Sequence, residues 1–522
     1  MSKPSKEHTQ DKNVPVFHII YEPWIHVRYL DGHETTLNIV DCLHDAKNIQ
    51  CILCPGRVYV ETYAIYRFLI ALLVDAYKIR SQRQIKKLFY EGLDLHVLEQ
   101  YVSDCEQQGI SFNVFDKTRP FMQTPVDELP KNVKTVSVSS FCYGLKSGND
   151  DIFYGIRQNI GDDAYMSIEE YIAMILTIHF CAVASGAGYS ASVPTVGQPP
   201  IWFLSKGQNL YETLFLSMYP TVDDDVPMWR RKKYLNVVKD VKGWLSLAFY
   251  PVRFIAPGDD FDGKFVRNVK FGRIQFKNYT DSASHPADIT SLWLKYEPFV
   301  ATCTYTDAKD NEKNFYIPLK FKREKDMWMR TSELYGCTYE NDSNKYHFTY
   351  PLILNTSRMF EEEEIFSTQS LYVLTLTTQT EKTPCQKLYE DFNEISDWMF
   401  DEELKEKIRH FISYTERSGR IFYDLIGKND LLKLRDKEYK KYQKKIYDIV
   451  GQYFTEIFLQ QIDSISLDDS LNHVKNQFLQ IMQDIPSNDI VQKYSAYGKL
   501  KFSLNKLLKE YITIEGCVEN GS

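Results

Sequence analysis

The feature that most constrains the fold is a long proline-free region near the C-terminal end of the chain. From about Lys387 until Pro486, no proline interrupts the sequence. Apolar residues recur there at the three- and four-residue spacing that buries one face of a helix, and they continue beyond Pro486. The four resulting stripes are Leu404, Ile408, Phe411 and Ile412; Ile446, Ile449, Val450, Phe454, Ile457 and Phe458; Val474, Phe478, Ile481 and Met482; and Leu500, Leu504, Leu507 and Leu508. With turns expected at 418–419, 464–469 and 486–488, this pattern predicts a C-terminal four-helix bundle.

Before this region, the chain alternates between short β-like runs and helical stretches. Between Val16 and Val40, apolar residues flank the turn dipeptide Asp31-Gly32, which predicts a β-hairpin. From 59 to 77, apolar residues recur at helical spacing and predict a core helix. Further helices are expected over 81–90 and 93–108, and residues 190–370, with many Val, Ile, Phe, Tyr and Thr runs, are interpreted mostly as β structure.

A helix with a capping motif lies between these regions. Ser167 and Glu170 have the S-x-x-E spacing in which each side chain caps a backbone N–H group, and they open an apolar helix over 168–184. We expect this helix to end at the Gly-rich turn 185–188. The segment 116–164 before it is long, irregular and rich in Pro, Gly, Asn and Asp, and segments of that kind are usually functional or disordered.

Taken together, these patterns predict an α+β protein of two main parts. A polar leader over 1–15 precedes a large mixed N-terminal domain with irregular β structure over 16–380. The four-helix bundle then occupies 381–522.

The charge balance limits which partners the surface can attract. The chain has 62 Lys+Arg against 70 Asp+Glu, a formal net charge of -8. A net acidic chain does not attract nucleic acid over its whole surface, so a polyanion would need a local basic patch. The 10 cysteines lie mostly in apolar segments, as reduced cytoplasmic thiols do. The apolar runs 64–74 and 171–184 are shorter than the roughly 18–20 residues that a membrane span needs, and the leader lacks a secretory apolar core. We therefore expect a cytoplasmic protein with no membrane partner.

No motif in the chain demands catalysis. The P-loop, H-E-x-x-H and G-x-S-x-G patterns are absent. Cys51 and Cys54 form the only C-x-x-C pair, whereas a structural zinc site needs four ligands, so we expect packed thiols, with no metal and no cofactor. His179 lies in the apolar helix and is interpreted as a core residue rather than a ligand. The acidic run 361–364 is expected to be solvated, although paired carboxylates could hold Mg²⁺ in a nucleic-acid enzyme.

Basic residues cluster at four places. The clusters are Arg80, Arg83, Lys86 and Lys87; Arg230, Arg231, Lys232 and Lys233; Lys320, Lys322, Arg323 and Lys325; and a helix expected over 428–445. Within that helix, the candidate contacts to a DNA backbone are Lys440, Lys441, Lys444 and Lys445. Each lysine on a phosphate would make binding depend on salt. The alternative is a solvated helix face balanced by Asp436 and Glu438.

Several short motifs carry a resemblance to one family by their order and spacing. They are Pro23-Trp24-Ile25-His26-Val27, Arg119-Pro120-Phe121-Met122-Gln123, Ser147-Gly148 followed by Ile152-Phe153, the glycine loop 185–190, KGQNLYETL at 206–214, and Trp244-Leu245-Ser246. With the C-terminal helices, they resemble the large subunit of the type I-E CRISPR Cascade surveillance complex over about residues 16–510.

The resemblance implies a non-catalytic subunit in antiviral defence. Such a subunit recognises the protospacer-adjacent motif (PAM) of double-stranded target DNA, aids strand opening and R-loop formation, and recruits the helicase-nuclease. The implied partners are the other Cascade subunits, the crRNA, the target DNA and that helicase-nuclease. RNA-guided recognition of this kind leaves sequence choice to base pairing. Two readings from other classes stay open: a Mg-dependent nucleic-acid enzyme using 361–364, and a scaffold whose basic helices bind only proteins.

Site residues are also implied by the resemblance. Gly186, Ala187 and Gly188 would approach the minor groove, Gln379 would be the wedge that splits the first base pair, Lys320 or Lys322 would lie near the PAM, and Phe153, with Tyr154 and Asn159, would contact crRNA or DNA. The structural alternatives are a helix cap for the glycines, a loop anchor for Phe153 and a surface role for Gln379. Some family members carry a cysteine zinc site in the middle region, but 254–276 contains no cysteine here.

Overall fold

The computed structural model of the chain describes residues 16–56, 60–138, 165–181, 201–231, 242–247, 253–273, 294–307, 310–319, 326–336, 338–341, 344–361, 370–377, 387–394, 397–428, 436–487 and 489–518. The chain divides into two compact units. Unit 1 comprises Met1–Phe321 and Pro351–Glu394, and unit 2 comprises Lys322–Tyr350 and Ile395–Ser522. Unit 2 is therefore discontinuous in sequence, because the chain returns to unit 1 between its two segments.

Unit 1 begins with the expected hairpin, which is extended into a three-stranded antiparallel sheet. The strand β1 (Ile25–Tyr29) lies between β2 (Glu34–Leu37) and β3 (Ile49–Ile52). Gly32 of the predicted turn has a φ of 91°, a backbone conformation that favours glycine. The helix α1 (Ile39–His44) follows β2. The prediction of this hairpin is confirmed.

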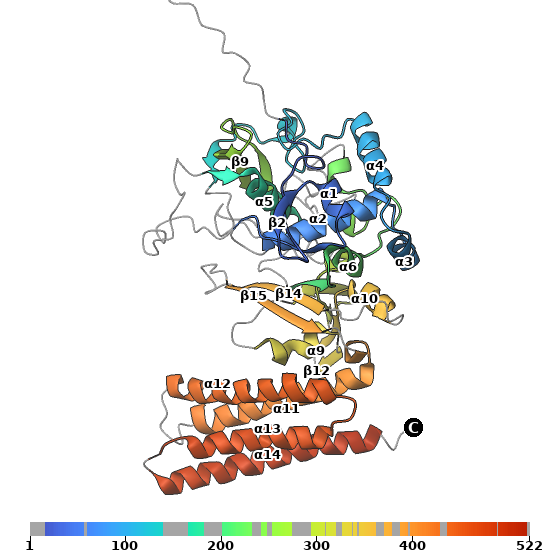
Figure 1. The fold of residues 1–522 in the computed structure, drawn as a ribbon. Helices are drawn as coiled ribbons and strands as arrows, with labels where there is room; N and C mark the ends of the chain where they lie inside the picture. The colour runs from blue at the N-terminus through green and yellow to red at the C-terminus, as the bar shows by residue number, and fades with distance from the viewer. Residues whose placement is uncertain are drawn as a thin grey trace, which may run out of the picture. The chain divides into compact units, whose positions relative to one another are not determined.

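Two apolar helices form the centre of unit 1. The helices α2 (Val60–Ala76) and α5 (Ile168–Cys181) pack against each other (Figure 1). The capping box that opens α5 forms as predicted: the Ser167 N–H donates to Glu170 Oε2 at 3.0 Å, and the Glu170 N–H donates to Ser167 Oγ at 3.2 Å. The other helices of unit 1 are α3 (Gln82–Glu91), α4 (Leu95–Gln107), α6 (Leu210–Leu216), α7 (Trp244–Leu247) and α10 (Leu354–Glu361).

A buried ion pair joins these central helices to a distant segment. Arg67 of α2 is 0% exposed, and its Nη2 lies 2.8 Å from Glu297 Oε1 and 2.9 Å from Oε2. Its Nη1 also donates to the Phe180 carbonyl of α5 at 2.5 Å. Because both charges are removed from water, each depends on the other for compensation.

Small antiparallel sheets make up the rest of unit 1. Their strands are β4 (Thr135–Ser137), β5 (Met166–Ser167), β6 (Ile201–Lys206), β7 (Arg253–Pro257), β8 (Phe265–Val266), β9 (Asn268–Arg273), β10 (Thr302–Asp307), β11 (Asp310–Pro318), β14 (Ser370–Thr377) and β15 (Lys387–Glu394). The order is β15-β14-β6 in one sheet and β4-β9-β7 in another, while β5 pairs with β8 and β10 with β11. The strands predicted between 190 and 370 are present, together with short helices.

The helical pattern expected from about Lys387 is wrong at its start. Residues Lys387–Glu394 form β15, which pairs with β14 from Thr377↔Lys387 to Ser370↔Glu394. The strand is stabilised by hydrogen bonds to a neighbouring strand, which a local periodicity does not reveal. The helical region begins only at Glu402.

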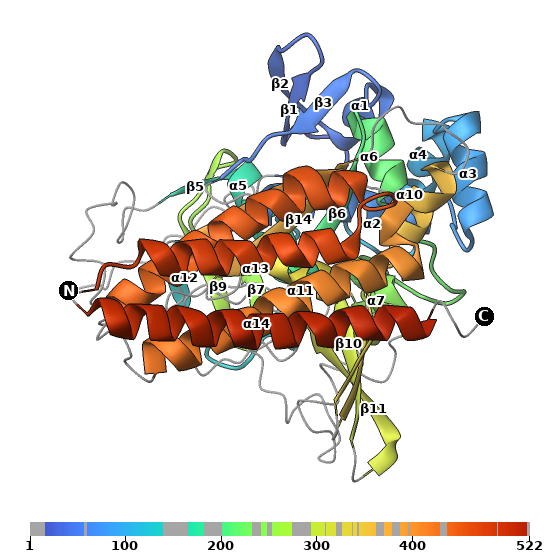
Figure 2. The ribbon, with the colours of Figure 1, turned by 90° about the horizontal axis from the view of Figure 1, so that it is seen from below.

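Four long helices form unit 2, as predicted (Figures 1 and 2). They are α11 (Glu402–Phe422), α12 (Asp436–Tyr453), α13 (Leu467–Asp484) and α14 (Ile490–Val518). The helix α13 packs on α11, α12 and α14, and α14 also packs on α11. The chain turns at 462–466 and leaves the helix again at 485–487, next to the positions predicted for these turns, while 488 lies outside the described residues. The turn expected at Ser418-Gly419 is wrong, because α11 continues through these two buried residues, and Gly419 lies beside Tyr447 of α12.

An indole ring helps to anchor the first segment of unit 2 on the long helices, alongside the packing of Tyr335 on Trp398. Trp328 lies 5.4 Å from Phe454 and 6.5 Å from Phe411 between ring centroids, and it contacts the helix α12 at Gly451. The same segment contains α9 (Thr331–Leu334) and the hairpin of β12 (Thr338–Asn341) and β13 (Asn344–Thr349). Aromatic packing therefore connects a short insertion to the helical core.

Candidate nucleic-acid interface

The predicted site residues divide into a described group and a group outside the described residues. Those outside are Phe153, Tyr154, Asn159, Gly186, Ala187, Gly188, Lys320, Lys322 and Gln379. Those described are Lys440, Lys441, Lys444 and Lys445. These four residues, named here the α12 lysine face, are the described part of the predicted site.

All four lysines of the α12 lysine face are exposed, whereas Tyr439, Ile446 and Val450 of the same helix are buried. The spacing places Lys440 above Lys444 and Lys441 above Lys445, since residues four apart are neighbours on a helix. Each pair of like charges at this spacing destabilises a helix by about 0.2–0.5 kcal/mol. The arrangement therefore costs stability while concentrating positive charge.

Carboxylates lie close to this positive charge, and the charge of Lys444 acts to lower the pKa of Asp326. Lys445 Nζ lies 3.4 Å from Asp484 Oδ2 of α13, and both side chains are about half exposed. The helix α12 as a whole carries five lysines against Asp436, Glu438 and Asp448. Exposed ion pairs of this kind contribute at most about 1 kcal/mol to stability. A lysine can therefore leave its carboxylate for a phosphate with little loss of stability. Such contacts would bind a nucleic-acid backbone without reading its sequence.

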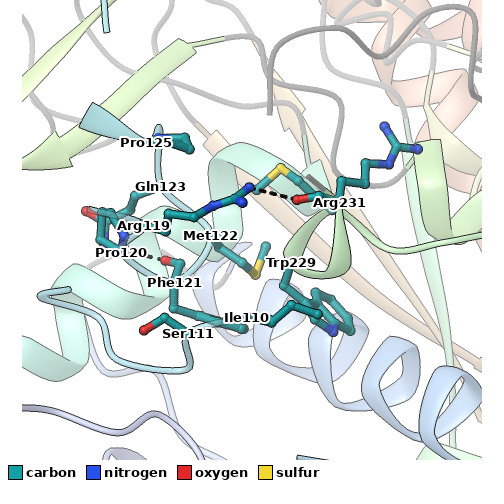
Figure 3. Close-up of a pocket in the computed structure, with 11 residues that line it drawn as sticks. Ile110, Ser111, Arg119, Pro120, Phe121, Met122, Gln123, Pro125, Trp229 and Arg231 are labelled. Carbon is teal, nitrogen blue, oxygen red and sulfur yellow. Dashed lines mark hydrogen bonds between the residues drawn. The ribbon is translucent and has the colours of Figure 1, made fainter. Parts of the chain in front are cut away.

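The Arg119–Gln123 motif of unit 1 forms a tight turn with mostly buried side chains, and this turn lines a small cavity (Figure 3). Met122 has a φ of 52°, in the left-handed region that non-glycine residues rarely adopt. Arg119 Nη2 donates to the Arg231 carbonyl at 2.8 Å, shown as a dashed line in Figure 3. The cavity lined by this turn has a volume of about 30 Å³. A cavity needs roughly 10–15 Å³ of such volume to hold one water, so this cavity has room for about two or three waters.

Buried hydrogen bonds hold this turn in place. Gln123 Nε2 donates to the Val114 carbonyl at 2.7 Å, and its Oε1 accepts a hydrogen bond from the Tyr171 hydroxyl at 2.5 Å. His179 Nε2 lies 2.8 Å from the carbonyl of Met122 and donates to it. Burial lowers the pKa of His179 to about 4, so the ring is neutral. The interpretation of His179 as a core residue is confirmed, and the motif provides a rigid scaffold.

The arginines predicted as part of a basic patch at 230–233 have structural partners. Arg230 Nη1 lies 2.9 Å from Asp75 Oδ1, and the Tyr101 hydroxyl donates to Asp75 Oδ2 at 2.6 Å. Burial raises the pKa of Asp75, and Arg230 opposes that rise. Arg231 donates to the Ser246 carbonyl at 3.1 Å. The only sequence signal for these contacts was an acid inside the apolar helix α2, which requires a partner from elsewhere in the chain.

The cysteine pair and the acidic run supply no metal centre in the described part of the chain. Cys51 and Cys54 form no disulfide bond, and Cys54 Sγ lies 3.7 Å from Glu61 Oε2. Burial raises the pKa of Cys54 to about 11, which makes the thiolate a minor form. Among the described residues, no group of three or more His, Cys, Asp or Glu side chains could hold a metal ion. Most of the acidic run, 362–364, lies outside them. None of the helices in the described ranges is long and apolar enough to span a bilayer.

Comparisons with known proteins agree over most of the chain. Residues 19–485 match the family model described as CRISPR-associated protein Cse1. The CRISPR-associated protein CasA/Cse1 of Thermus thermophilus is 27% identical over 222 residues, which cover 41% of this chain and 42% of that protein. The matched part therefore spans less than half of that relative.

Solved structures share the fold at low sequence identity. The Thermobifida fusca Cse1 crystal structure has a TM-score of 0.69 and 16% identity, covering 95% of this chain and 98% of that chain. A Thermus thermophilus CasA (Cse1) structure has a TM-score of 0.64 and 17% identity, with 95% and 99% coverage. A chain of a CRISPR RNA-guided surveillance complex has a TM-score of 0.71 and 13% identity, with 94% and 99% coverage.

Proposed function

Since this chain belongs to the CRISPR-associated Cse1 family, we propose that it is the non-catalytic large subunit of a type I-E Cascade surveillance complex in antiviral defence. The observation that carries the proposal is the family match over residues 19–485. The shared fold with solved Cse1 chains over 95% of the sequence supports it. In this role the chain works in the cytoplasm with the other Cascade subunits and the crRNA, as the chain similar to it in a CRISPR RNA-guided surveillance complex suggests.

The subunit recognises the PAM of double-stranded target DNA, aids strand opening and R-loop formation, and recruits the helicase-nuclease. The loop Gly186–Gly188 approaches the minor groove, where missing side chains let the backbone come close. Gln379 acts as the wedge, and Lys320 or Lys322 lies near the PAM. Phe153, with Tyr154 and Asn159 beside it, contacts crRNA or DNA, and stacking of Phe153 on a base would contribute about 1–3 kcal/mol.

The α12 lysine face contributes contacts to the DNA backbone. Four exposed lysines on one helix support this role, because phosphate contacts need positive charge and no sequence-specific geometry. Such contacts position the duplex while base pairing with the guide selects the sequence.

Charge reversal of the α12 lysine face tests this contact. The variant changes all four lysines to Glu, and a control with the same change of total charge reverses the exposed residues Lys117, Lys131, Lys134 and Lys264. The measurement is the affinity of the assembled complex for target duplex across a salt series. If all four lysines touch phosphates, the slope of log K against log salt becomes shallower by up to about 3.6, at about 0.9 per contact.

The outcomes separate the three functional classes. Equal slopes in the variant, the control and the wild type would refute the backbone contact. Loss of assembly with unchanged duplex affinity would favour a protein-binding scaffold. A Mg-dependent nucleic-acid enzyme would show divalent-dependent turnover that disappears when the glutamates at 361–364 become alanine.

PAM recognition is tested separately with Gly188→Asp. The assembled wild-type and variant complexes bind a duplex library with a randomised PAM. We expect discrimination among PAM sequences to collapse in the variant while assembly is retained, because a carboxylate would repel phosphates at the groove. Identical PAM preferences in both complexes would show that the glycine loop does not read DNA.

A further inference from the structure

The last turn of α5 is held by two buried hydrogen bonds from side chains. Arg67 Nη1 of α2 donates to the Phe180 carbonyl at 2.5 Å, and His179 Nε2 donates to the Met122 carbonyl at 2.8 Å. Both side chains are buried. We name these two hydrogen bonds the α5 end contacts. They connect the end of α5 to the helix α2 and to the Arg119–Gln123 turn.

The contact from Arg67 satisfies a backbone group that a helix does not satisfy by itself. Carbonyls in the last turn of a helix have no N–H partner within that helix. A cation at this end also interacts favourably with the helix dipole. The Arg67 guanidinium supplies both the N–H group and the charge at the Phe180 carbonyl.

Stability alone does not account for a charged pair at this place. A buried ion pair is often no more stable than apolar residues of similar volume, because both charges must leave water. What Arg67 and Glu297 add over an apolar pair is a donor at a fixed position beside the end of α5. A precise position, rather than a gain in stability, is therefore what the pair provides.

The Arg67 guanidinium is itself held on several sides. Both oxygens of Glu297 accept from Nη2, and Glu297 Oε1 also accepts from the Phe299 N–H at 3.1 Å. The guanidinium carbon lies 4.4 Å from the centroid of the Phe299 ring. A planar guanidinium that is paired and stacked in this way has a defined orientation. The donor to the end of α5 is therefore fixed by the segment around Phe299.

The contact from His179 connects α5 to a turn with a constrained backbone (Figure 3). Met122, which accepts this hydrogen bond, has a φ of 52°, and such conformations persist only where the surrounding structure determines them. Two residues later, the Thr124 N–H donates to the Ile255 carbonyl at 2.6 Å, and the Ile255 N–H donates to Thr124 Oγ1 at 3.1 Å. The turn is therefore anchored on β7, and it provides a second fixed point for the end of α5.

The end of α5 leads into the glycine loop. Gly186 follows Cys181 by five residues, and a chain of five residues spans at most about 18 Å. We propose that Arg67 and His179 are positioning residues for the PAM contact, because they hold the end of the helix from which this loop begins. The inference rests on the proposed function, in which 186–188 approaches the minor groove.

A double variant removes the contact from Arg67 without leaving a buried charge unpaired. Arg67→Met combined with Glu297→Leu keeps the site apolar and filled, whereas either change alone leaves one charge without its partner. The Phe180 carbonyl then loses its donor while most of the stability is retained. The double variant therefore separates the position of α5 from the stability of unit 1.

Two substitutions at His179 and one control complete the set. His179→Leu removes the donor to the Met122 carbonyl, whereas His179→Gln keeps an N–H group that can donate to it. The control Ser357→Ala removes a buried hydrogen bond outside α5, from Ser357 Oγ of α10 to Ser205 Oγ at 2.7 Å.

The measurement is the ratio of affinities for duplexes with a preferred and an altered PAM. Each full-length variant is assembled with the remaining subunits. We expect the ratio to fall at least about tenfold in the double variant and in His179→Leu, because a displacement of about 1 Å can cost about 100-fold. His179→Gln and Ser357→Ala should keep the wild-type ratio. Amide hydrogen exchange over 178–181 should be faster in the double variant and in His179→Leu than in the control.

The outcomes distinguish the positioning proposal from the proposed function. A wild-type ratio in the double variant and in His179→Leu would overturn the positioning proposal and leave PAM recognition by 186–188 intact. An equal loss of the ratio in Ser357→Ala would also overturn it, because the loss would then follow stability. If the wild-type complex does not discriminate among PAM sequences, or if Gly188→Asp leaves its discrimination unchanged, the proposed PAM recognition fails and the positioning proposal fails with it.

Discussion

Replacing Gly451 by alanine would drive a methyl group into the indole ring that anchors the first segment of unit 2. A Cβ at this position would lie 2.8 Å from Trp328 Cδ1 and 3.0 Å from Cε2, which is closer than Cβ contacts in folded proteins. The indole cannot move away freely, because Phe454 and Phe411 pack around it at centroid distances of 5.4 and 6.5 Å. The helix α12 or the ring must therefore shift.

Two opposing contributions determine how much Gly451→Ala changes the stability of unit 2. Alanine is favoured over glycine in a helix by about 1 kcal/mol, and overpacking a filled space costs about 1–3 kcal/mol. Gly498→Ala receives only the first contribution, since no atom lies within 4 Å of its new methyl group. We therefore expect Gly498→Ala to stabilise unit 2 by up to about 1 kcal/mol. Gly451→Ala should be about 1–3 kcal/mol less stable than Gly498→Ala.

Differential scanning calorimetry of the full chain measures this difference in stability as a shift in the melting temperature of unit 2. For a domain of this size, 1 kcal/mol corresponds to about 2–4 °C in Tm. Gly451→Ala combined with Trp328→Leu removes the ring, so the added methyl group should then cost less than it does beside the indole. Equal stabilisation by Gly451→Ala and Gly498→Ala would refute the reasoning, because it would mean that no clash exists.

Three further changes concern unit 1. The pKa of His179 in the folded protein, about 4, is below its unfolded value near 6.5. Its contribution to the free energy of unfolding is therefore complete above pH 6.5 and is lost as the pH falls toward 4. In urea unfolding, the free energy of unfolding of the wild type should fall by about 2 kcal/mol between pH 7 and 5, and His179→Gln should lack this fall. Arg67→Met should lower stability by about 3–5 kcal/mol in thermal unfolding, because Glu297 is left buried and unpaired, and adding Glu297→Leu should restore most of it. Ser167→Ala should cost about 1 kcal/mol and speed amide hydrogen exchange in the first turn of α5.

Each of these expectations has a contradicting result. A pH dependence shared by wild type and His179→Gln would assign the acid loss to other groups. A double variant at Arg67 and Glu297 as unstable as the single variant would show that packing, not the unpaired charge, determines the cost. Unchanged exchange in Ser167→Ala would mean that the cap does not hold the start of α5.

The parts of the fold that follow from neighbouring residues were predictable from the sequence. The hairpin around Gly32 needs only a turn and alternation, and the capping box of Ser167 is complete within four residues. By contrast, β15 forms because β14 lies beside it, and its own pattern resembles the helices that follow. Local periodicity does not contain such partners.

The same distinction applies to the candidate site. The clustered lysines at 440–445 predicted a charged, solvated helix face, and Lys440 and Lys444 are exposed. Arg230 looked equally available in the sequence, but Asp75, far away in the chain, lies within 2.9 Å of it. Clustered charge in a sequence predicts a binding surface only when no buried residue of opposite charge needs it.

The two-part make-up of unit 2 affects how the chain is synthesised. Trp328 leaves the ribosome well before Phe454 and Gly451 are made, and at roughly 5–20 residues per second the interval is on the order of 10 s. During that time, the nascent indole lacks the rings that cover it in the finished protein. A fragment that starts at Ile395 would contain all four long helices and still lack the side chain that packs beside Gly451.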